Sequence, residues 1–467
     1  MALKHRLKIN PYPYQEEGIL QGLKWKRFFL GDEPGLGKTL QSIGVVDTAA
    51  AYPCLVICPS SLKINWQREF EKFTDKKALV LDNSNATTWP YLLQMKTHHV
   101  AICNYESLRK FFVWDIKGDK KTFRLKDIVF AEQIKLFRSV IIDESHRVKD
   151  ASTQQTKFAK GICVGKEYII LLSGTPVVNK PEDLVAQLSI MERLNEFGGK
   201  VQFLGNYAEG ENLKILSSEL YQRCMIRREK KKVLTQLPDK TRCDLYVDIS
   251  NHDEYDLAQS DLESYLREYR DCNDWEIRKK MRMKALVQFM ALRSIAAHGK
   301  VAQAIDFIKT FLENGKPLIV FCSLHDIVDE LKRAFPKAVS VTGRDSQVMK
   351  QAAVDNFQNG DSQLIICSIK AAGVGLTLTA SSNVAFIEFP WTYADCCQCE
   401  DRAHRIGQKD NVTCYYLLGS GTIDHYLYQI IHKKKSIANE IMAADDDIPT
   451  DQLYFDELVK SMFNLKL

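Results

Sequence analysis

Short runs of branched apolar residues alternate with longer stretches of helical character along most of this 467-residue chain. Apolar runs of this length between helices are typical of strands buried on both faces of a parallel sheet. The pattern therefore predicts an α/β fold, and at roughly 150 residues per domain the length fits about three domains or two large ones. The runs are Phe28–Leu30, Cys54–Cys58, Val100–Cys103, Val140–Ile142 and Tyr168–Leu172 in the first half, and Leu318–Cys322, Leu364–Cys367, Val384–Ile387 and Cys414–Leu418 in the last third.

The strand-like runs fade between residues 226 and 298, where both signs of charge become dense. One face of an amphipathic helix is marked there, at spacings i, i+3, i+4 and i+7, by Leu262, Tyr265, Leu266 and Tyr269. We interpret this segment as a helical linker or protrusion between two α/β lobes; the alternative is that it belongs to the helical layer of one lobe. The predicted division is a first lobe at 1–225, the helical segment at 226–298, a second lobe at 299–442 and a C-terminal packing helix within 443–467.

The composition is that of an ordinary soluble globular protein, with 45% apolar and 26% charged residues, and it excludes a disordered or disulfide-stapled chain. The net charge of +5 is too small over this length to indicate nucleic acid by itself. The 13 cysteines are scattered, often within apolar runs, as reduced core residues are. We therefore expect a cytoplasmic location in a bacterial or phage-type host, or a nuclear one in a eukaryote. Residues 1–15 lack the apolar core of a secretory signal and no apolar run approaches the ~18 residues of a membrane helix, so we expect no membrane partner.

A glycine-rich loop that ends in Lys38 and Thr39 follows the first apolar run and precedes a helical stretch. This order of strand, loop and helix is the context that a phosphate-binding P-loop requires. Gly35 and Gly37 would let the backbone N–H groups wrap a phosphate, Lys38 would reach the β- and γ-phosphates, and Thr39 would ligate Mg²⁺. The strict motif has glycine where this chain has Asp32, and a purely structural glycine-rich turn is the alternative.

The apolar run Val140–Ile142 ends in two carboxylates, Asp143 and Glu144. This is the layout of a Walker B motif, in which Asp143 would hold Mg²⁺ and Glu144 would orient and deprotonate the attacking water. An acidic pair after a buried strand is common, so the interpretation depends on the P-loop upstream of it.

Arg402 and Arg405 are spaced i, i+3 on a predicted helix, so they would project from one face. Two guanidinium groups could neutralise the charge that develops on a γ-phosphate, as an arginine finger does. Because the arginines and the loop lie at opposite ends of the chain, hydrolysis would then require the lobes to close. The alternative is a surface pair that forms salt bridges with Glu400 or Asp401.

Further motifs extend the pattern over nearly the whole chain, from Tyr14 to about Met442: Pro13-Tyr14-Gln15, Cys58 to Phe70, Asp143-Glu144-Ser145-His146, Leu172-Ser173-Gly174-Thr175-Pro176, Met225 to Arg228, Gly373 to Thr377, Pro390-Trp391 and Gln398 to Gln408. Together these segments resemble helicase superfamily 2, and within it the Swi/Snf branch of double-stranded-DNA translocases. The Ser145 form of the acidic motif resembles the annealing-helicase relatives, and the chain looks closest to those and to HepA-like members.

The resemblance implies two RecA-like P-loop lobes, parallel sheets flanked by helices, that use ATP and Mg²⁺. It implies that Gln15 reads the adenine base and that Gln398 also contacts the nucleotide. Asp32 is the residue that the family carries at that position. The residues that would couple ATP to DNA are His146, Ser173 and Thr175.

Two basic clusters are candidates for DNA contact. Residues 223–242 hold eight Lys or Arg against two acids, and residues 107–137 hold eight against four. Phosphate contacts are independent of sequence and sensitive to salt, so we expect duplex or branched DNA of any sequence as the partner. An insertion that packs on the first lobe is the alternative for 107–137. The expected contacts are Ser61, Lys63, Asn104, Arg227, Arg228, Thr342, Arg344, Lys370 and Thr377, with Trp391 stacking or wedging.

The expected function is an ATP-dependent translocase on double-stranded DNA that remodels or reanneals DNA or displaces bound protein. The alternatives are a strand-separating DNA or RNA helicase and a degenerate ATPase that acts as a scaffold; the second is disfavoured because the catalytic set Lys38, Asp143, Glu144, Arg402 and Arg405 is intact. Only a short stretch precedes Gln15, so we expect a minimal motor, similar to bacterial or phage members, that a recruiting protein would direct. Cys396, Cys397 and Cys399 have no second pair at metal spacing, so we expect no zinc.

Overall fold

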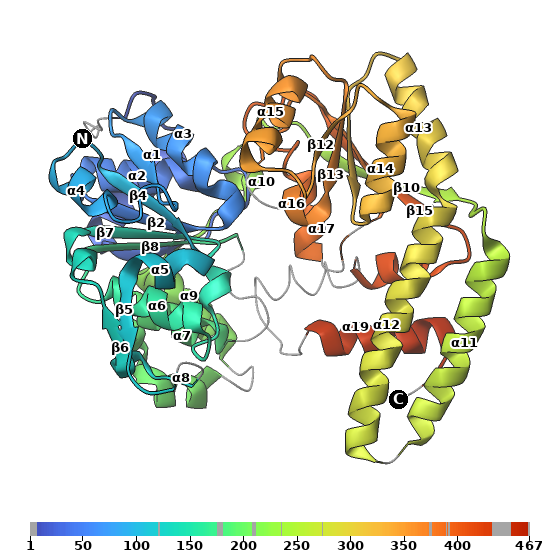
Figure 1. Cartoon of the computed structure of the whole chain (residues 1–467), viewed down its shortest axis with the longest axis horizontal. Helices are drawn as coiled ribbons and strands as arrows, with labels where there is room; N and C mark the ends of the chain where they lie inside the picture. The colour runs from blue at the N-terminus through green and yellow to red at the C-terminus, as the bar shows by residue number, and fades with distance from the viewer. Residues whose placement is uncertain are drawn as a thin grey trace. The chain divides into compact units, whose positions relative to one another are not determined.

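The computed structural model describes residues 7–119, 122–174, 181–207, 212–234, 236–272, 274–372, 376–388, 390, 393–431 and 450–465. By their contacts, the described residues up to Leu234 form one compact unit and those from Gln236 onward form a second (Figure 1). Each unit is an α/β lobe built on a parallel sheet, which confirms the predicted fold class of two P-loop-type lobes.

The first unit holds, within the described ranges, a seven-stranded parallel sheet in the order β3-β4-β2-β7-β8-β1-β9. Its central strands are buried along their whole length, as expected for a sheet covered on both faces. The strands are β1 Arg27–Leu30, β2 Cys54–Cys58, β3 Ala78–Val80, β4 Val100–Asn104, β7 Ser139–Asp143, β8 Tyr168–Leu172 and β9 Met225–Ile226.

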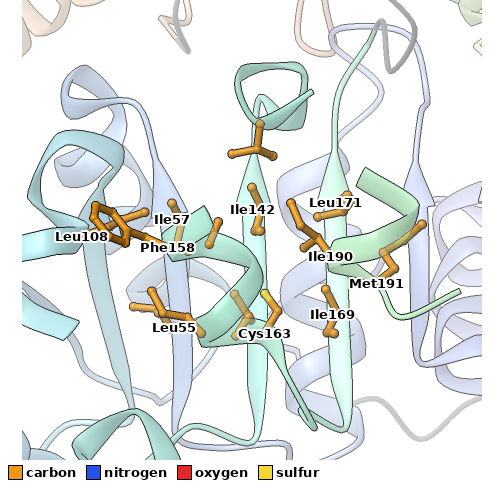
Figure 2. Close-up of a cluster of buried hydrophobic side chains, with 14 of the residues drawn as sticks. Leu55, Ile57, Leu108, Ile142, Phe158, Cys163, Ile169, Leu171, Ile190 and Met191 are labelled. Carbon is orange, nitrogen blue, oxygen red and sulfur yellow. The ribbon is translucent and has the colours of Figure 1, made fainter. Parts of the chain in front are cut away.

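Helices flank this sheet, and their apolar faces supply the other half of its core. Figure 2 shows Phe158 of α6 near Leu108 and near Ile57 of the sheet, and Ile190 of α7 near Leu171 of the sheet. The helices are α1 Pro13–Trp25, α2 Lys38–Thr48, α3 Lys63–Phe73, α4 Trp89–Gln94, α5 Leu108–Phe112, α6 Gln154–Cys163, α7 Asp183–Ile190, α8 Gly199–Tyr207, α9 Leu213–Arg223 and α10 Lys230–Val233.

The basic insert at residues 107–137 contains α5 and an antiparallel hairpin of β5 Val113–Ile116 and β6 Ile128–Phe130. Phe111 and Phe112 are buried in the core of the first unit, so the insert packs on this lobe. The register of the hairpin shifts at Trp114, which is 83% exposed, as a bulge that re-aims a side chain would produce. Contact of this insert with DNA stays a prediction.

The second unit holds, in its described part, a six-stranded parallel sheet in the order β10-β15-β14-β11-β13-β12. The strands are β10 Lys240–Val247, β11 Leu318–Cys322, β12 Val339–Val341, β13 Leu364–Ser368, β14 Asn383–Phe386 and β15 Val412–Gly419. The helices are α11 His252–Asp271, α12 Trp275–Gly299, α13 Val301–Glu313, α14 His325–Ala334, α15 Gln347–Gln358, α16 Ile369–Ala372, α17 Tyr393–Glu400 and α19 Thr450–Phe463.

The segment that we interpreted as a linker or protrusion at 226–298 is part of the second unit from Gln236 onward. Its strand β10 pairs with β15 over eight residues, and α11 and α12 form a hairpin of long helices (Figure 1). Leu262 on α11 and Phe289 on α12 are buried in the same core cluster as the sheet. The alternative, a helical layer of one lobe, is therefore what the structure shows. The strand was missed because its residues alternate between half-buried and exposed, as at a sheet edge.

The C-terminal helix α19 lies across α12 in Figure 1, as the predicted packing helix would. Leu458 and Val459 are buried in the core of the second unit, and the rings of Phe289 and Phe463 have centroids 6.5 Å apart. None of the helices in the described ranges combines the length and the apolar character that crossing a bilayer requires.

Candidate functional site

The predicted nucleotide motifs of the first unit gather at one edge of its sheet. Because the strands are parallel, their carboxyl ends meet at the same edge, where ligands of open α/β sheets bind. Lys38 begins α2 after β1, Asp143 ends β7, and Ser173 follows β8, which lies between β7 and β1. The strand order thus joins three motifs that are far apart in the sequence.

The P-loop has the backbone that phosphate binding needs. Gly35 and Gly37 have φ values of 90° and 75°, a left-handed conformation that favours glycine, and Gly37 caps the N-terminus of α2. Lys38 Nζ donates a hydrogen bond to the Asp32 backbone carbonyl at 2.7 Å, so the amine reaches back over the loop. Burial lowers the pKa of Lys38, and the Glu144 carboxylate is the strongest opposing influence. The buried Lys38 amine and the N-terminus of α2 are both positively polarised, so together they favour the binding of a phosphate chain.

Gly174 closes the other side of the loop. A Cβ atom at Gly174 would lie 3.1 Å from Pro34 Cγ and 3.8 Å from Lys38 Nζ, so a larger residue would crowd the loop. This approach brings the predicted coupling motif against the predicted phosphate cradle. Thr175 lies outside the described residues.

Asp143 is held in place by three neighbouring groups. Its Oδ2 accepts from Trp66 Nε1 at 2.9 Å, its Oδ1 accepts from the Glu144 backbone N–H at 3.0 Å, and Tyr105 donates its hydroxyl to the Asp143 carbonyl at 2.5 Å. Burial, and then the Glu144 carboxylate, raise the pKa of Asp143 to about 7. The carboxyl groups of Asp143 and Glu144 thus disfavour each other's negative charge, which a bound cation would relieve. With the hydroxyl of Thr39 in the first turn of α2, they are oxygen donors of the kind that Mg²⁺ prefers.

Sequence reasoning missed Trp66 and Tyr105 as residues of this site. Both are about 1% exposed, and a buried indole N–H or phenol hydroxyl needs an acceptor, which here is Asp143. This need for an acceptor could have drawn attention to Trp66, which lies within the motif from Cys58 to Phe70. The sequence does not show, however, which group is the acceptor.

His146 connects the acidic motif with the coupling motif. Its Nδ1 lies 3.4 Å from Glu144 Oε2 and 3.4 Å from Ser173 Oγ. Glu144 itself has a left-handed backbone, with φ of 54°, which turns its side chain relative to that of Asp143. The predicted coupling residues His146 and Ser173 therefore meet beside the predicted water-activating carboxylate.

Gln15 lies against the P-loop, as the resemblance implies. It is 2% exposed, its Nε2 donates to the Leu36 carbonyl at 3.1 Å, and its Oε1 accepts from the Tyr12 backbone N–H at 3.0 Å. The Tyr14 hydroxyl also donates to the Leu36 carbonyl, at 3.1 Å. Helix α1 thus supports the loop through its first turn. Base reading by Gln15 stays a prediction.

Asp32 has a structural task that the sequence did not indicate. Its carboxylate accepts from Arg228 Nε at 3.1 Å, from Arg228 Nη2 at 2.9 Å and from Gln41 Nε2 at 2.9 Å. Asp32 is fully buried and the Arg228 side chain is 15% exposed. The Arg227 guanidinium donates to the carbonyls of Gly31 and Gly174. Both guanidinium groups therefore face the nucleotide loop, and contact of Arg227 and Arg228 with DNA stays a prediction.

The other expected DNA contacts of the first unit lie at the carboxyl ends of β2 and β4. Cys58 and Asn104 are paired in the sheet, and Ser61 and Lys63 follow Cys58 at the start of α3. Asn104 is 8% exposed and donates to Glu106 Oε2 at 2.8 Å.

An open cavity of about 510 Å³ is lined in part by Tyr105 and Glu106, the two residues that follow Asn104 in the chain. Its lining includes Glu106, Arg109 and Arg147, and the Arg147 guanidinium stacks over the Tyr105 ring at 4.8 Å. Arg147 directly follows the acidic motif and was not among the expected contacts. Two arginines at this edge are compatible with phosphate contact.

The residues of the second unit that we expect to contact DNA differ in their exposure to solvent. Thr342 and Lys370 follow the paired strands β12 and β13, so both lie at one sheet edge. Lys370 is exposed, whereas Thr342 is 4% exposed and its hydroxyl donates to Asp345 Oδ2 at 2.8 Å within a turn. Arg344 pairs with Asp329 at 2.8 Å on the surface, Thr377 is half-buried, and Trp391 lies outside the described residues.

Arg402 and Arg405 do not share a helix, which corrects the prediction. Helix α17 ends at Glu400 and residues 401–407 form successive turns. The Arg402 backbone N–H bonds the carbonyl three residues back, and the Arg405 backbone N–H bonds the carbonyl two residues back. Arg402 is 8% exposed, and Arg405 Nη1 donates to the Leu376 carbonyl at 2.9 Å. Gln398 is half-buried on α17.

Glu400 and Asp401 do not behave as a solvated surface pair. They form ion pairs with Lys240, at 2.8 and 3.1 Å, and Glu400 also pairs with Arg242 at 2.6 Å. Although burial opposes it, these cations, Lys240 first, hold the pKa of Glu400 below its usual range. The neighbouring Cys396 and Cys399 are 1% exposed and belong to the apolar core, where burial raises the pKa of both thiols. The expected absence of zinc stays a prediction.

Comparison with known proteins assigns these motifs to a family. Residues 18–301, more than half of the chain, match the SNF2-related domain. This chain belongs to the SNF2-related family. Residues 299–407 match the helicase conserved C-terminal domain, so the domain content is that of a DNA-dependent ATPase of the helicase type. The resemblance to the Swi/Snf branch of superfamily 2 is thereby confirmed.

Several relatives of this SNF2-related chain carry informative names. A homolog of SWI/SNF-related matrix-associated actin-dependent regulator of chromatin subfamily A-like protein 1 from Caenorhabditis elegans is 29% identical, over 94% of this chain and 63% of its own length. The DNA annealing helicase and endonuclease ZRANB3 of Homo sapiens is 30% identical, over 94% of this chain and 41% of its own. The SWI2/SNF2 ATPase core of Sulfolobus solfataricus, solved in complex with dsDNA, aligns over 97% of this chain and 98% of its own at 25% identity, with a TM-score of 0.43. The chain thus spans 41% to 63% of the length of the two curated relatives.

Proposed function

We propose that this chain hydrolyses ATP to translocate on double-stranded DNA, and that it thereby remodels or reanneals DNA or displaces bound protein. The observation that carries the proposal is the meeting of Lys38, Asp143, Glu144 and the His146–Ser173 pair at one sheet edge. This arrangement supplies a phosphate-binding amine, a metal-binding carboxylate and a water-activating carboxylate in one place, with a link to the coupling motif.

Each residue at this edge has a defined task in the proposal. Lys38 exchanges the Asp32 carbonyl for phosphate oxygens, and its charge stabilises the negative charge that the reaction builds up. Mg²⁺, which Thr39 and Asp143 would hold, neutralises phosphate charge when bound. Glu144 accepts the proton of the attacking water, and His146 lies close enough to take part in orienting that carboxylate.

The second unit contributes Arg402 and Arg405, and the proposal assigns them the neutralisation of charge at the γ-phosphate. Their turn is held by Gln408, which is 8% exposed and donates to the carbonyls of Ser381 and Ala403. A positively charged group that is fixed in advance lowers the barrier without reorganising during the reaction.

Duplex DNA as the partner is supported by the family and by the name of one relative. ZRANB3 is named a DNA annealing helicase, which favours reannealing of strands over their separation. The proposal further includes a preference for branched DNA, a recruiting protein, and a cytoplasmic location in a bacterial or phage-type host or a nuclear one in a eukaryote.

The test is ATP hydrolysis at fixed low salt with no nucleic acid, single-stranded DNA, duplex DNA, a forked DNA and duplex RNA. We expect duplex and forked DNA to stimulate hydrolysis most, followed by displacement of a triplex strand by the translocating protein. Stimulation mainly by single strands or RNA would instead identify a strand-separating helicase.

Two variants calibrate this assay. Glu144→Gln should lower kcat by at least about a hundredfold, because the base is lost while nucleotide contacts remain. Glu132→Gln, which removes an exposed carboxylate paired with Lys135 in the same unit, is the matched control and should behave as wild type. Equal turnover by Glu144→Gln and wild type would refute the assignment of the base.

A further inference from the structure

The chain passes from the first unit to the second through residues 227–242, here called the strap. Each end of the strap is anchored by an ion pair to a buried carboxylate: Arg228 pairs with Asp32 of the P-loop in the first unit, and Arg242 pairs with Glu400, just before Arg402, in the second unit. We propose that the strap couples the P-loop to the arginine-bearing turn at 401–407, with Arg228 and Arg242 as its positioning residues. This inference rests on the proposed function and deepens it.

The first anchor joins the strap to the P-loop and to α1. Arg228 binds the buried Asp32 carboxylate with two nitrogens, its Nη2 donates to Gln41 Oε1 at 2.6 Å, and its Nη1 donates to the Tyr14 carbonyl. A bidentate arginine pair fixes orientation as well as distance. Gly18 of α1 leaves space for this arrangement, since a Cβ atom there would lie 2.6 Å from Arg228 Nη2.

The backbone of the strap is bonded to the same loop. The Glu33 backbone N–H donates to the Arg228 carbonyl at 3.1 Å, and the Glu33 carboxylate accepts from the Lys230 backbone N–H at 2.8 Å. The Arg227 guanidinium spans from the Gly31 carbonyl to the Gly174 carbonyl, at 3.3 and 3.0 Å. A shift of the loop when Lys38 releases the Asp32 carbonyl would therefore move the start of the strap.

The second anchor joins the end of the strap to the segment that carries the arginines. Arg242 donates to both oxygens of Glu400, at 2.6 and 2.7 Å, and Glu400 is fully buried. Lys240 pairs with Glu400 and Asp401, directly before Arg402. His404 Nε2 lies 2.8 Å from the Pro238 carbonyl, within the same turn region.

The two anchoring ion pairs hold the strap in a more defined geometry than apolar packing alone would need. Burying charged groups is expensive even when they are paired, and apolar residues would often hold two segments together equally well. What ion pairs of this kind provide is a defined register between segments. Here the Arg228–Asp32 pair fixes the P-loop, which carries Lys38, relative to the start of the strap. The Arg242–Glu400 pair fixes the turn that carries Arg402 relative to the end of the strap.

The decisive experiment slackens the strap without touching either anchor. Three glycines are inserted after Gln236 in the full chain, and the Kd for a fluorescent ADP analogue, KM and kcat for ATP are measured with and without duplex DNA. We expect Kd and KM within about twofold of wild type and kcat lowered at least tenfold in both conditions. A kcat equal to that of wild type in the insertion variant would overturn the proposal.

Anchor variants separate positioning from mere support of the fold. Arg228→Gln and Arg242→Gln should each lower kcat at least tenfold with little change in Kd, and Arg228→Lys should recover part of the loss because it keeps one charged contact. Arg138→Gln, which breaks an exposed pair with Glu167 in the first unit, is the matched control. If Kd rises by the same factor as kcat falls, the anchors only support the loop and the proposal fails. If DNA did not stimulate ATP hydrolysis by the wild type, the proposed function would be refuted. The kcat of the strap variants relative to wild type without DNA would still test the role of the strap.

Discussion

Trp66 of α3 donates its indole N–H to Asp143 Oδ2 at 2.9 Å, which joins the segment expected to grip DNA to the carboxylate expected to hold Mg²⁺. The indole is 1% exposed and its ring packs beside Phe70 at a centroid distance of 6.1 Å. Any displacement of α3 by DNA would therefore reach the Asp143 side chain through one hydrogen bond. Residues that orient a metal-binding group in this way typically affect metal affinity and activity by 10- to 100-fold, roughly.

Replacing Trp66 by Phe should keep the packing and remove the hydrogen bond. We expect the Mg²⁺ concentration for half-maximal ATP hydrolysis to rise about tenfold, because Asp143 loses the partner that orients it. The measurement is a Mg²⁺ titration of the steady-state rate. Trp114→Phe, at an exposed position of the same unit, serves as the control and should titrate like wild type.

The salt dependence of DNA binding should identify phosphate contacts. Each contact contributes a slope of about −0.9 to a plot of log affinity against log salt concentration on duplex DNA. Lys63→Gln should reduce the magnitude of the slope by about one, whereas Lys72→Gln, near the other end of α3, should not. Fluorescence anisotropy at several salt concentrations gives both slopes. An unchanged slope for Lys63→Gln would remove this residue from the interface.

Lys300 is a buried cation in the second unit whose removal should be strongly destabilising. Its Nζ donates to the carbonyls of Ile387 and Leu417 at 2.6 and 2.9 Å and to Asp424 Oδ2 at 2.5 Å. Lys300→Met leaves a buried carboxylate uncompensated and should lower the free energy of unfolding by about 3–5 kcal/mol. The double variant Lys300→Met with Asp424→Asn should recover part of this loss in urea unfolding. Equal stability of the single and double variants would contradict the explanation.

Two glycine substitutions should have opposite signs although both lie in helices. A Cβ atom at Gly22 of α1 would lie 2.6 Å from Phe28 Cζ and 2.6 Å from Val45 Cγ2, and both partners are buried. Gly22→Ala should therefore destabilise the first unit by about 1–3 kcal/mol. Gly205→Ala in α8 meets no atom within 4 Å and should stabilise it by about 0.5–1 kcal/mol through helix propensity. Thermal unfolding of both variants beside wild type checks the two signs.

The sequence predicted the sheets well because burial on both faces leaves a local signal. All nine apolar runs are strands of the two parallel sheets, for example Cys54–Cys58 as β2 and Leu318–Cys322 as β11. The edge strands β3, β9 and β12 were missed because two or three residues are too few to show a pattern, and the half-exposed β10 was missed because a strand with one open side has a mixed composition. The helix end at Glu400 was missed because the turns at 401–407 are held by distant partners: Asp401 pairs with Lys240, and Arg405 donates to the Leu376 carbonyl.

The chemistry of the site was predictable where it depends on spacing along the chain. Lys38 after a glycine loop, and Asp143 with Glu144 after an apolar run, are local patterns with a physical cause, and the structure brings them to one edge. Arg227 and Arg228 were assigned to DNA because they lie in a basic cluster. The structure turns both toward the P-loop: Arg228 pairs with the buried Asp32 carboxylate, which needs a cation, and Arg227 donates to the backbone carbonyls of Gly31 and Gly174.

The sequence by itself determined the α/β class, the strands of both sheet cores, the nucleotide motifs and the family. These follow from hydrophobic periodicity and from short motifs, which act between neighbours in the chain. Only the tertiary structure decided which charged groups meet: Arg228 and Asp32 are 196 residues apart, and Arg242 and Glu400 are 158 residues apart. An ion pair depends on distance in space and on burial, and neither quantity is set until the strands have taken their order in the sheet.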